Sequence, residues 1–122
     1  MTAHISYHNL KKKKDNRRIW LEGAALLDCG FAPGDFFSLS LNIDNLNVVI
    51  KHIPDSPEAR RRHAKKEIRK VSRRKCVGWV KPIIDICNAG ITSLFGEFCR
   101  FKAELTPGVV QFGIHPEDLA RA

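Results

Sequence analysis

The sequence lacks several features that would place it in common classes of protein. No apolar run approaches the roughly 20 residues that a membrane-spanning helix needs. The lysine run near the N-terminus has no apolar segment after it, so we expect no signal peptide. Only four cysteines occur, without a C-x-x-C pair or histidines at zinc-finger spacing. We therefore expect no membrane partner, no metal and no cofactor.

Catalytic motifs are also absent. No serine lies in a nucleophile elbow, and no glycine-rich phosphate loop follows a predicted strand. The acidic residues considered for catalysis are scattered and show no acid-pair spacing: Asp28, Asp35, Asp85, Glu97 and Glu104. Cysteine–histidine chemistry would need His52 or His115 to meet a cysteine in space. We predict that the protein is not an enzyme.

Acidic residues are outnumbered by basic ones. The chain has 21 Lys and Arg against 13 Asp and Glu, which gives a formal net charge of +8. Such a charge favours nucleic acid first, and an acidic membrane or protein surface second. Hydrophobic residues at 43% and a length of 122 residues are typical of one globular domain with a modest core. We expect a cytoplasmic protein, associated with the nucleoid if it binds DNA.

One stretch of the sequence occurs twice, from Ile19 to Ile53 and from Ile83 to Ile114. Five apolar positions recur at one constant offset: Leu27, Phe31, Phe37, Ala25 and Leu41 match Ile91, Phe95, Phe101, Ala89 and Leu105. The closing segments, NVVIKHI and GVVQFGI, match at a slightly smaller offset, with Val48 opposite Val109. A fixed offset indicates a repeated structural unit. The alternative is a chance match between two amphipathic segments.

Each copy is predicted to form a strand, a short helix and a β-hairpin. In the first copy these are strand 19–21, helix 24–29 ended by Gly30, a Pro33-Gly34 turn, and strands 37–41 and 48–53. In the second they are strand 83–86, helix 89–95 between Asn88 and Gly96, strand 101–105, a Thr106-Pro107-Gly108 turn and strand 109–114. We expect a mainly β fold with short helices, of α+β class, in which the two units form a small pseudo-symmetric barrel.

Two basic segments flank these units. Residues 1–18 carry a block of like charges, which predicts a flexible arm that either contacts nucleic acid or is simply solvated. Ser56-Pro57-Glu58 is typical of a helix start, and ten cations follow within positions 60–75. We expect a basic helix or half-ordered connector there, with a thin apolar stripe at Ala64, Ile68 and Val71. The predicted organisation is arm 1–18 and domain 19–122, with unit one at 19–54, connector at 55–75 and unit two at 76–116.

The turn after the first helix reads Gly30, Phe31, Ala32, Pro33, Gly34 and Asp35. It resembles the swapped-hairpin proteins of the SpoVT/AbrB superfamily, and within it the SymE-like branch. In that family two subunits each supply a strand–helix–hairpin unit and interlace into one nucleic-acid-binding barrel. The resemblance implies a single-chain tandem that acts as a DNA-binding regulator or architectural factor. The second copy departs from the motif, with Gly96-Glu97-Phe98-Cys99 in place of the Pro-Gly-Asp turn.

Basic side chains are the candidate contact surface, because they neutralise phosphates and release counterions. The candidates are Arg17, Arg18, Arg60, Arg61, Arg62, Lys65, Lys66, Arg69, Lys70, Arg73, Arg74, Lys75 and Lys81. Trp20 and Trp79 are predicted to pack in the core or at the barrel rim, with base stacking as the alternative. The cysteines are predicted to be small buried residues without disulfides.

Three hypotheses remain open. The first is double-stranded DNA binding, which we favour, and the second is RNA binding by a SymE-like toxin. The third is a small phage or mobile-element protein whose basic face binds an acidic surface on a host or defence protein and so inhibits it. The protein would be a monomer or a homodimer in each case.

Overall fold

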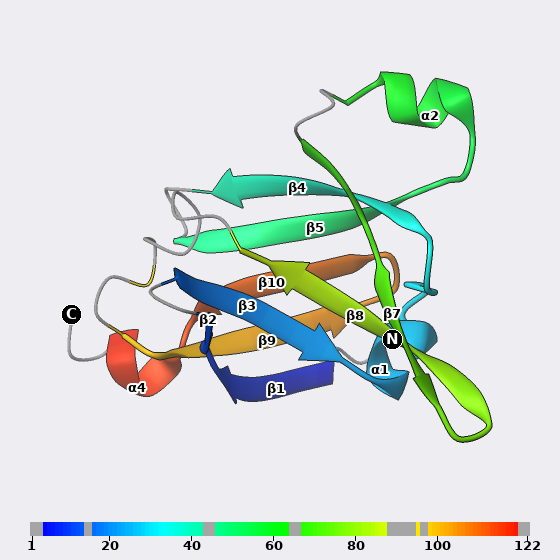
Figure 1. Cartoon of the computed structure of the whole chain (residues 1–122). Coiled ribbons are helices and arrows are strands. Elements are labelled where there is room, and N and C mark those ends of the chain that lie inside the picture. Colours follow the sequence, from blue (N-terminus) through cyan, green and yellow to red (C-terminus); the bar gives the residue numbers. More distant parts are fainter. Residues whose placement is uncertain are drawn as a thin grey trace.

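The computed structural model describes residues 4–13, 16–42, 46–63, 67–87, 95 and 98–119. Their strands form two antiparallel sheets (Figure 1). The six-stranded sheet has the order β1 (His4–Asn9), β9 (Arg100–Thr106), β10 (Val109–Ile114), β5 (Asn47–Ile53), β4 (Phe36–Asn42) and β6 (Ile68–Lys70). The four-stranded sheet has the order β2 (Lys11–Lys13), β3 (Asn16–Glu22), β8 (Trp79–Ile86) and β7 (Ser72–Cys76). The described helices are α1 (Ala24–Asp28), α2 (Pro57–Arg61) and α4 (Pro116–Leu119).

The hydrophobic core lies between the two sheets. Strands β3 and β8 lie in front of β9 and β10 in Figure 1. One connected cluster joins Ile19 and Ile84 of the smaller sheet to Phe37, Phe101 and Phe112 of the larger one. The predicted mainly β class with short helices is therefore confirmed. Among the described residues, no helix is long and apolar enough to cross a bilayer.

Corresponding strands of the two copies pair with each other. Strand β3 pairs antiparallel with β8, and β5 pairs antiparallel with β10. Phe31 and its counterpart Phe95 are both fully buried, as are Phe37 and its counterpart Phe101. Antiparallel pairing of equivalent strands is the arrangement that an approximate two-fold axis produces, so the two copies share one core.

The closing strands correspond in a register that differs by one residue from the predicted match. Leu41 pairs with Val48, and its counterpart Leu105 pairs with Val110 rather than with Val109. Val48 and Val110 are both fully buried, which places them in the same role. A shift of one residue moves a side chain to the opposite face of a strand. Aligning the identical residues of the two closing segments, with Val48 opposite Val109, therefore gave the wrong register.

The repeat begins earlier than the sequence suggested, because both basic segments belong to it. The chain crosses from the larger to the smaller sheet at Leu10, between β1 and β2, and again at Val71, between β6 and β7. Leu10 is 8% exposed and Val71 2%. The Leu10 amide donates to the Cys99 carbonyl at 2.7 Å, and the Val71 amide to the Asp35 carbonyl at 2.8 Å. Asp35 and Cys99 are related by the same offset as the repeated apolar positions, so the two crossings are equivalent.

These strands correct two expectations. Residues 4–13, expected in a flexible arm, form β1 and β2 at the edges of the sheets. Within the described part of the basic connector, α-helix spans Pro57–Arg61, where the Ser56 hydroxyl accepts the Ala59 amide at 3.1 Å as predicted. Residues 68–70 and 72–76 are strands instead, because pairing with β4 and β8 and burial of Val71 outweigh a helix with little apolar surface. Ala64, Lys65 and Lys66 lie outside the described residues.

The turn that carries the family resemblance has its predicted local structure. Gly30 adopts a φ of 92°, and the amides of Gly30 and Phe31 donate to the carbonyls of Leu27 and Leu26, which ends α1. The Asp35 carboxylate accepts the Ala32 amide at 3.0 Å and contacts His52 Nε2 at 3.1 Å. The helix predicted at 89–95 and its flanking Asn88 and Gly96 lie outside the described residues, except for Phe95.

Candidate nucleic-acid interface

The first group of predicted cations forms ion pairs and hydrogen bonds within the protein. Arg18 lies 3.3 Å from Asp85 in an ion pair, although its Nε and the Asp85 oxygen are not aligned for a hydrogen bond. Arg17 donates to the Phe98 carbonyl at 2.8 Å. Lys81 contacts Glu22 at 3.2 Å. These contacts join segments that are distant in sequence, so the three charges contribute to holding the fold together.

Glu22 also holds Trp20 at the outer face of the smaller sheet. Trp20 Nε1 donates to Glu22 at 3.0 Å, and this bond is the main cause of a Glu22 pKa below its usual value, with Lys81 contributing. The Lys11 ammonium lies 4.3 Å from the centre of the Trp20 ring. Trp20 is half-buried under this cation, so it packs at the rim as predicted.

The second group lies on α2. Arg60 pairs with Asp55 at 2.7 Å, and its guanidinium lies 4.8 Å from the centre of the Phe36 ring. Arg61 and Arg62 are exposed at the end of this helix. Lys65 and Lys66 lie outside the described residues. This group adds positive charge beside β6 without forming a continuous row of its own.

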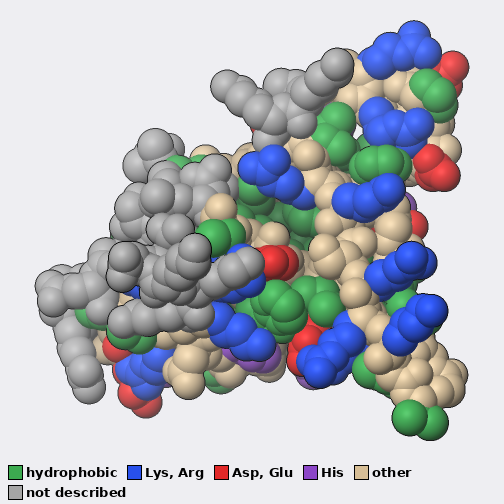
Figure 2. Space-filling view, in the orientation of Figure 1, with side chains coloured by type: hydrophobic (Ala, Val, Ile, Leu, Met, Phe, Trp, Pro, Cys, Tyr) green, Lys and Arg blue, Asp and Glu red, His purple; other side chains and the backbone are tan. Residues whose placement is uncertain are grey.

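The third group, here called the basic edge, comprises Arg69, Lys70, Arg73, Arg74 and Lys75. All five side chains are exposed on β6 and β7, which are consecutive edge strands, β6 of the larger sheet and β7 of the smaller one. Within the described part of the chain, none of the five forms an ion pair with a carboxylate. Figure 2 shows basic side chains running down this side of the molecule, from α2 along β7. The basic edge is the least neutralised group of predicted cations.

A hollow opens where the basic edge changes sheets. Its volume is about 470 Å³, and it is lined by Pro33, Gly34, Lys70, Val71, Ser72 and Arg73. Two cations and a hydroxyl therefore border a space beside the Pro-Gly-Asp turn. Donors of this kind suit a phosphate oxygen, because charge-assisted hydrogen bonds to anions are the strong ones.

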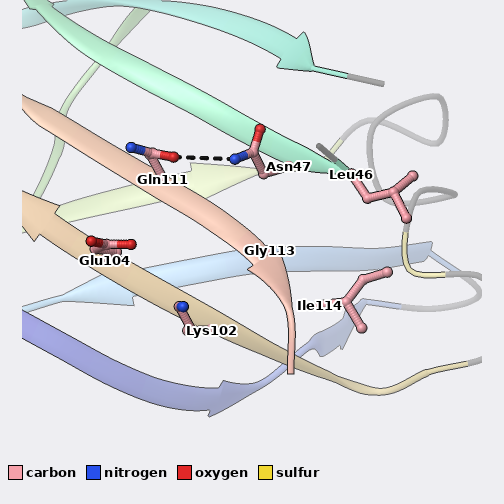
Figure 3. A pocket seen from close by; sticks show the side chains of 7 residues that line it. All are labelled: Leu46, Asn47, Lys102, Glu104, Gln111, Gly113 and Ile114. Atoms are coloured by element: carbon pink, nitrogen blue, oxygen red, sulfur yellow. Dashed lines mark hydrogen bonds between the residues drawn. The ribbon is translucent and has the colours of Figure 1, made fainter. Parts of the chain in front are cut away.

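A smaller hollow on the outer face of the larger sheet has a different character. It encloses about 170 Å³ and is lined by Leu46, Asn47, Lys102, Glu104, Gln111, Gly113 and Ile114 (Figure 3). Asn47 donates to Gln111 at 3.1 Å across it, and one lysine faces one glutamate. This balanced charge favours no anion, so the hollow does not belong to the interface.

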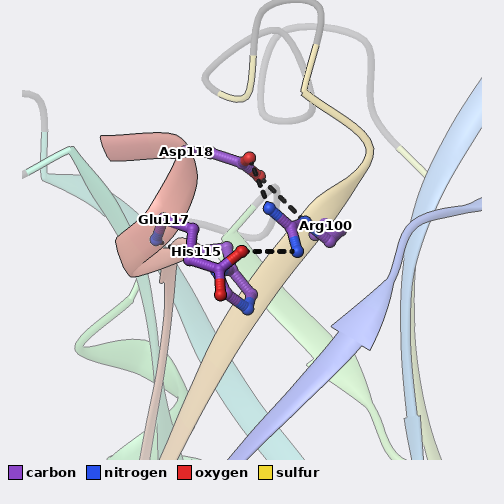
Figure 4. A network of polar contacts seen from close by, with 4 residues as sticks. All are labelled: Arg100, His115, Glu117 and Asp118. Atoms are coloured by element: carbon purple, nitrogen blue, oxygen red, sulfur yellow. Dashed lines mark hydrogen bonds and ion pairs between the residues drawn. The ribbon is translucent and has the colours of Figure 1, made fainter. Parts of the chain in front are cut away.

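The main polar network outside the interface is structural. Arg100 binds the buried Asp118 at 2.7 Å and Glu117 at 3.3 Å, which docks α4 onto β9 (Figure 4). The bond to Asp118 is the main cause of an Arg100 pKa above its usual value. Sequence reasoning did not single out Arg100, because its partners come from a short terminal helix that is distant along the chain.

The cysteines only partly match their prediction. None of the four forms a disulfide, but Cys87 and Cys99 are exposed and Cys76 is half-buried, so only Cys29 is a buried residue. Burial raises the pKa of the Cys29 thiol, and Asp28 acts in the same direction. His52 contacts Asp35, and the His115 ring lies 5.0 Å from Tyr7. No cluster of three metal-binding side chains occurs among the described residues.

No protein-family model, curated protein or solved structure matches this chain. The interface is therefore defined by its charge and geometry.

Proposed function

We propose that this protein binds nucleic acid through the basic edge, and that duplex DNA is the favoured partner. The observation that carries this proposal is the row of five exposed cations without carboxylate partners in the described part of the chain, on consecutive edge strands. Phosphates can replace the counterions of such a row, and the entropy of released ions then drives binding. The hollow beside Lys70 and Arg73 offers a defined place for one phosphate.

Protection of the sheet edges is the simplest competing explanation. Charged edge strands prevent sheets from pairing edge to edge, and lysine is common there. Protection alone, however, does not require a single sign of charge, and neighbouring like charges repel one another. A row of five cations beside the further cations of α2 therefore favours an anionic partner over protection alone.

The resemblance to the SpoVT/AbrB superfamily supports a DNA-binding regulator or architectural factor. We propose that the barrel is the single-chain form of the family's swapped-hairpin pair. The pairings of β3 with β8 and of β5 with β10 support this relation, because strands of one copy interlace with their equivalents in the other. The Gly30–Asp35 turn is the motif that the chain shares with the family.

The shape of the basic edge favours DNA over RNA. The basic edge continues into a two-stranded ribbon, β7 with β8, and a ribbon of this width fits the major groove of B-form DNA. The major groove of A-form RNA is too narrow for side chains to read. An RNA target would have to offer single-stranded bases or its shallow minor groove.

A salt titration separates the three hypotheses. Binding to a DNA duplex, an RNA duplex of the same sequence and polyglutamate would be measured from about 50 to 200 mM salt. We expect the tightest binding to DNA, with an affinity that falls steeply as salt rises. Stronger binding to RNA would favour the SymE-like alternative, and binding to polyglutamate alone would favour an acidic protein. Absence of binding to both nucleic acids at low salt would refute the proposal.

A further inference from the structure

The two copies differ most in the hairpin that starts at their second basic strand. Lys13 pairs with Asn16 in the first copy, with only positions 14 and 15 between them. The equivalent pair in the second copy is Arg74 with Lys81, since Val71 corresponds to Leu10. Two more pairs follow there, Lys75 with Val80 and Cys76 with Trp79. The second hairpin is therefore longer by these two pairs, and the added length lies outside the shared barrel.

This added length ends in an apolar tip. Val77 and Gly78 form the turn, in which Gly78 has a φ of 81°. Val77 is 102% exposed, and Trp79 and Val80 are 40% exposed each, so Trp79 lies beyond the core and rim where it was predicted to pack. In Figure 1 the hairpin projects beyond both sheets, and in Figure 2 hydrophobic atoms form its end, with basic side chains along the adjoining strand. A valine and a tryptophan outside the core add little to the stability of the fold, but they are accessible to a binding partner.

The charge beside the tip decides which partner fits it. A second copy of the chain is disfavoured, because pairing β7 with β7 would set Arg and Lys opposite Arg and Lys. A membrane would contact only the tip and its nearest cations, whereas the basic edge continues from Lys75 back to Arg69. A long polyanion can contact all the cations of the basic edge as well as the tip. Nucleic acid is therefore the partner that fits the whole surface.

We propose that the β7–β8 hairpin is a DNA-kinking arm. Arg73, Arg74 and Lys75 hold phosphates, and the side chains of Val77 and Trp79 insert into a base step. Apolar wedges of this kind unstack the step and bend the duplex by about 20–90°. The inference rests on the proposed function and adds to it a deformation of the DNA.

The test measures bending separately from affinity. A duplex of about 25 base pairs carries a donor and an acceptor dye at its ends and 2-aminopurine at internal steps, so that kinking and unstacking are read together. We expect the full-length protein to shorten the end-to-end distance and to raise 2-aminopurine fluorescence. Val77→Ser should retain binding and lose both signals. Because the Val77 side chain is fully exposed, this variant should fold as the wild type does.

Two further variants keep the result specific. Trp79→Ser should also lose the bending signal, while Leu46→Ser removes an exposed apolar side chain at the start of β5 and should change nothing. If the protein binds DNA without bending or unstacking it, the kinking arm is refuted while the proposed function stands. If it does not bind DNA, both fail. Changed Trp79 fluorescence on phosphatidylserine vesicles, without a kink in DNA, would refute the arm in favour of a membrane contact.

Discussion

His8 shows how one side chain of β1 links the N-terminal segment to the rest of the larger sheet. Its ring stacks on Phe101 with 5.2 Å between centroids, and its Nε2 lies 2.7 Å from the Ser6 hydroxyl. Burial lowers the pKa of His8 below its ordinary value of 6.5, and His4 acts in the same direction. The unfolded chain therefore takes up a proton below this pH more readily than the folded protein does.

This difference predicts a loss of stability in acid. The free energy of unfolding should fall as the pH drops below 6.5, because the unfolded state then binds more protons. His8→Phe should reduce that dependence, whereas His4→Gln, which keeps the burial of His8, should retain most of it. Urea denaturation at pH values between about 7.5 and 5.5 measures the effect. Equal pH dependence in wild type and His8→Phe would contradict it.

At the residue scale, sequence reasoning succeeded where neighbours along the chain set the structure. The glycine that ends α1, the Pro33-Gly34 turn and the Ser56 cap depend on backbone rules within a few residues. It did not foresee partners from distant segments. Arg18 and Lys81, which were predicted to bind phosphates, form ion pairs with Asp85 and Glu22, each from the opposite half of the chain.

At the scale of elements, the two sheet crossings decide whether the basic segments belong to the fold. Leu10→Ala should lower the free energy of unfolding by about 2–3 kcal/mol, and Val71→Ala by about 1–2 kcal/mol, because each removes buried methyl groups. Ile5→Ala, at an exposed position of β1, is the matched control and should cost much less. Denaturant titration followed by circular dichroism measures all three. A flexible N-terminal arm would instead make Leu10→Ala silent.

The same elements explain why the repeat was only partly visible. The two basic segments have in common their cations and one buried apolar residue each, Leu10 and Val71, which is too little for a sequence match. An edge strand pairs on one side only and needs no alternating pattern of its own. The strand character of β6, β7, β1 and β2 comes from the strands with which they pair, β4, β8, β9 and β3. The sequence instead predicted a basic helix or half-ordered connector for the second segment, from the helix start at Ser56 and the thin apolar stripe, and a flexible arm for the first.

At the scale of the whole molecule, the two matching stretches of sequence contribute to one core and differ at the surface. The shared parts are the crossed sheets and the buried phenylalanines. The second copy has the longer hairpin, and the five exposed cations of the basic edge lie on its first two strands. Composition predicted a basic interface around 60–75, and the exposed row of cations lies at 69–75. Its arrangement as two edge strands could not be read from charge alone.

The salt dependence of DNA binding tests the basic edge most directly. Arg74→Gln with Lys75→Gln would be compared with Lys51→Gln and Lys102→Gln, which remove the same charge from the outer face of the larger sheet. The first pair should weaken binding at every salt concentration and reduce the slope of log affinity against log salt by about 1.8, or about 0.9 per phosphate contact. The second pair should leave the slope unchanged. Equal losses in both variants, or wild-type affinity in the first, would contradict the assignment of the interface.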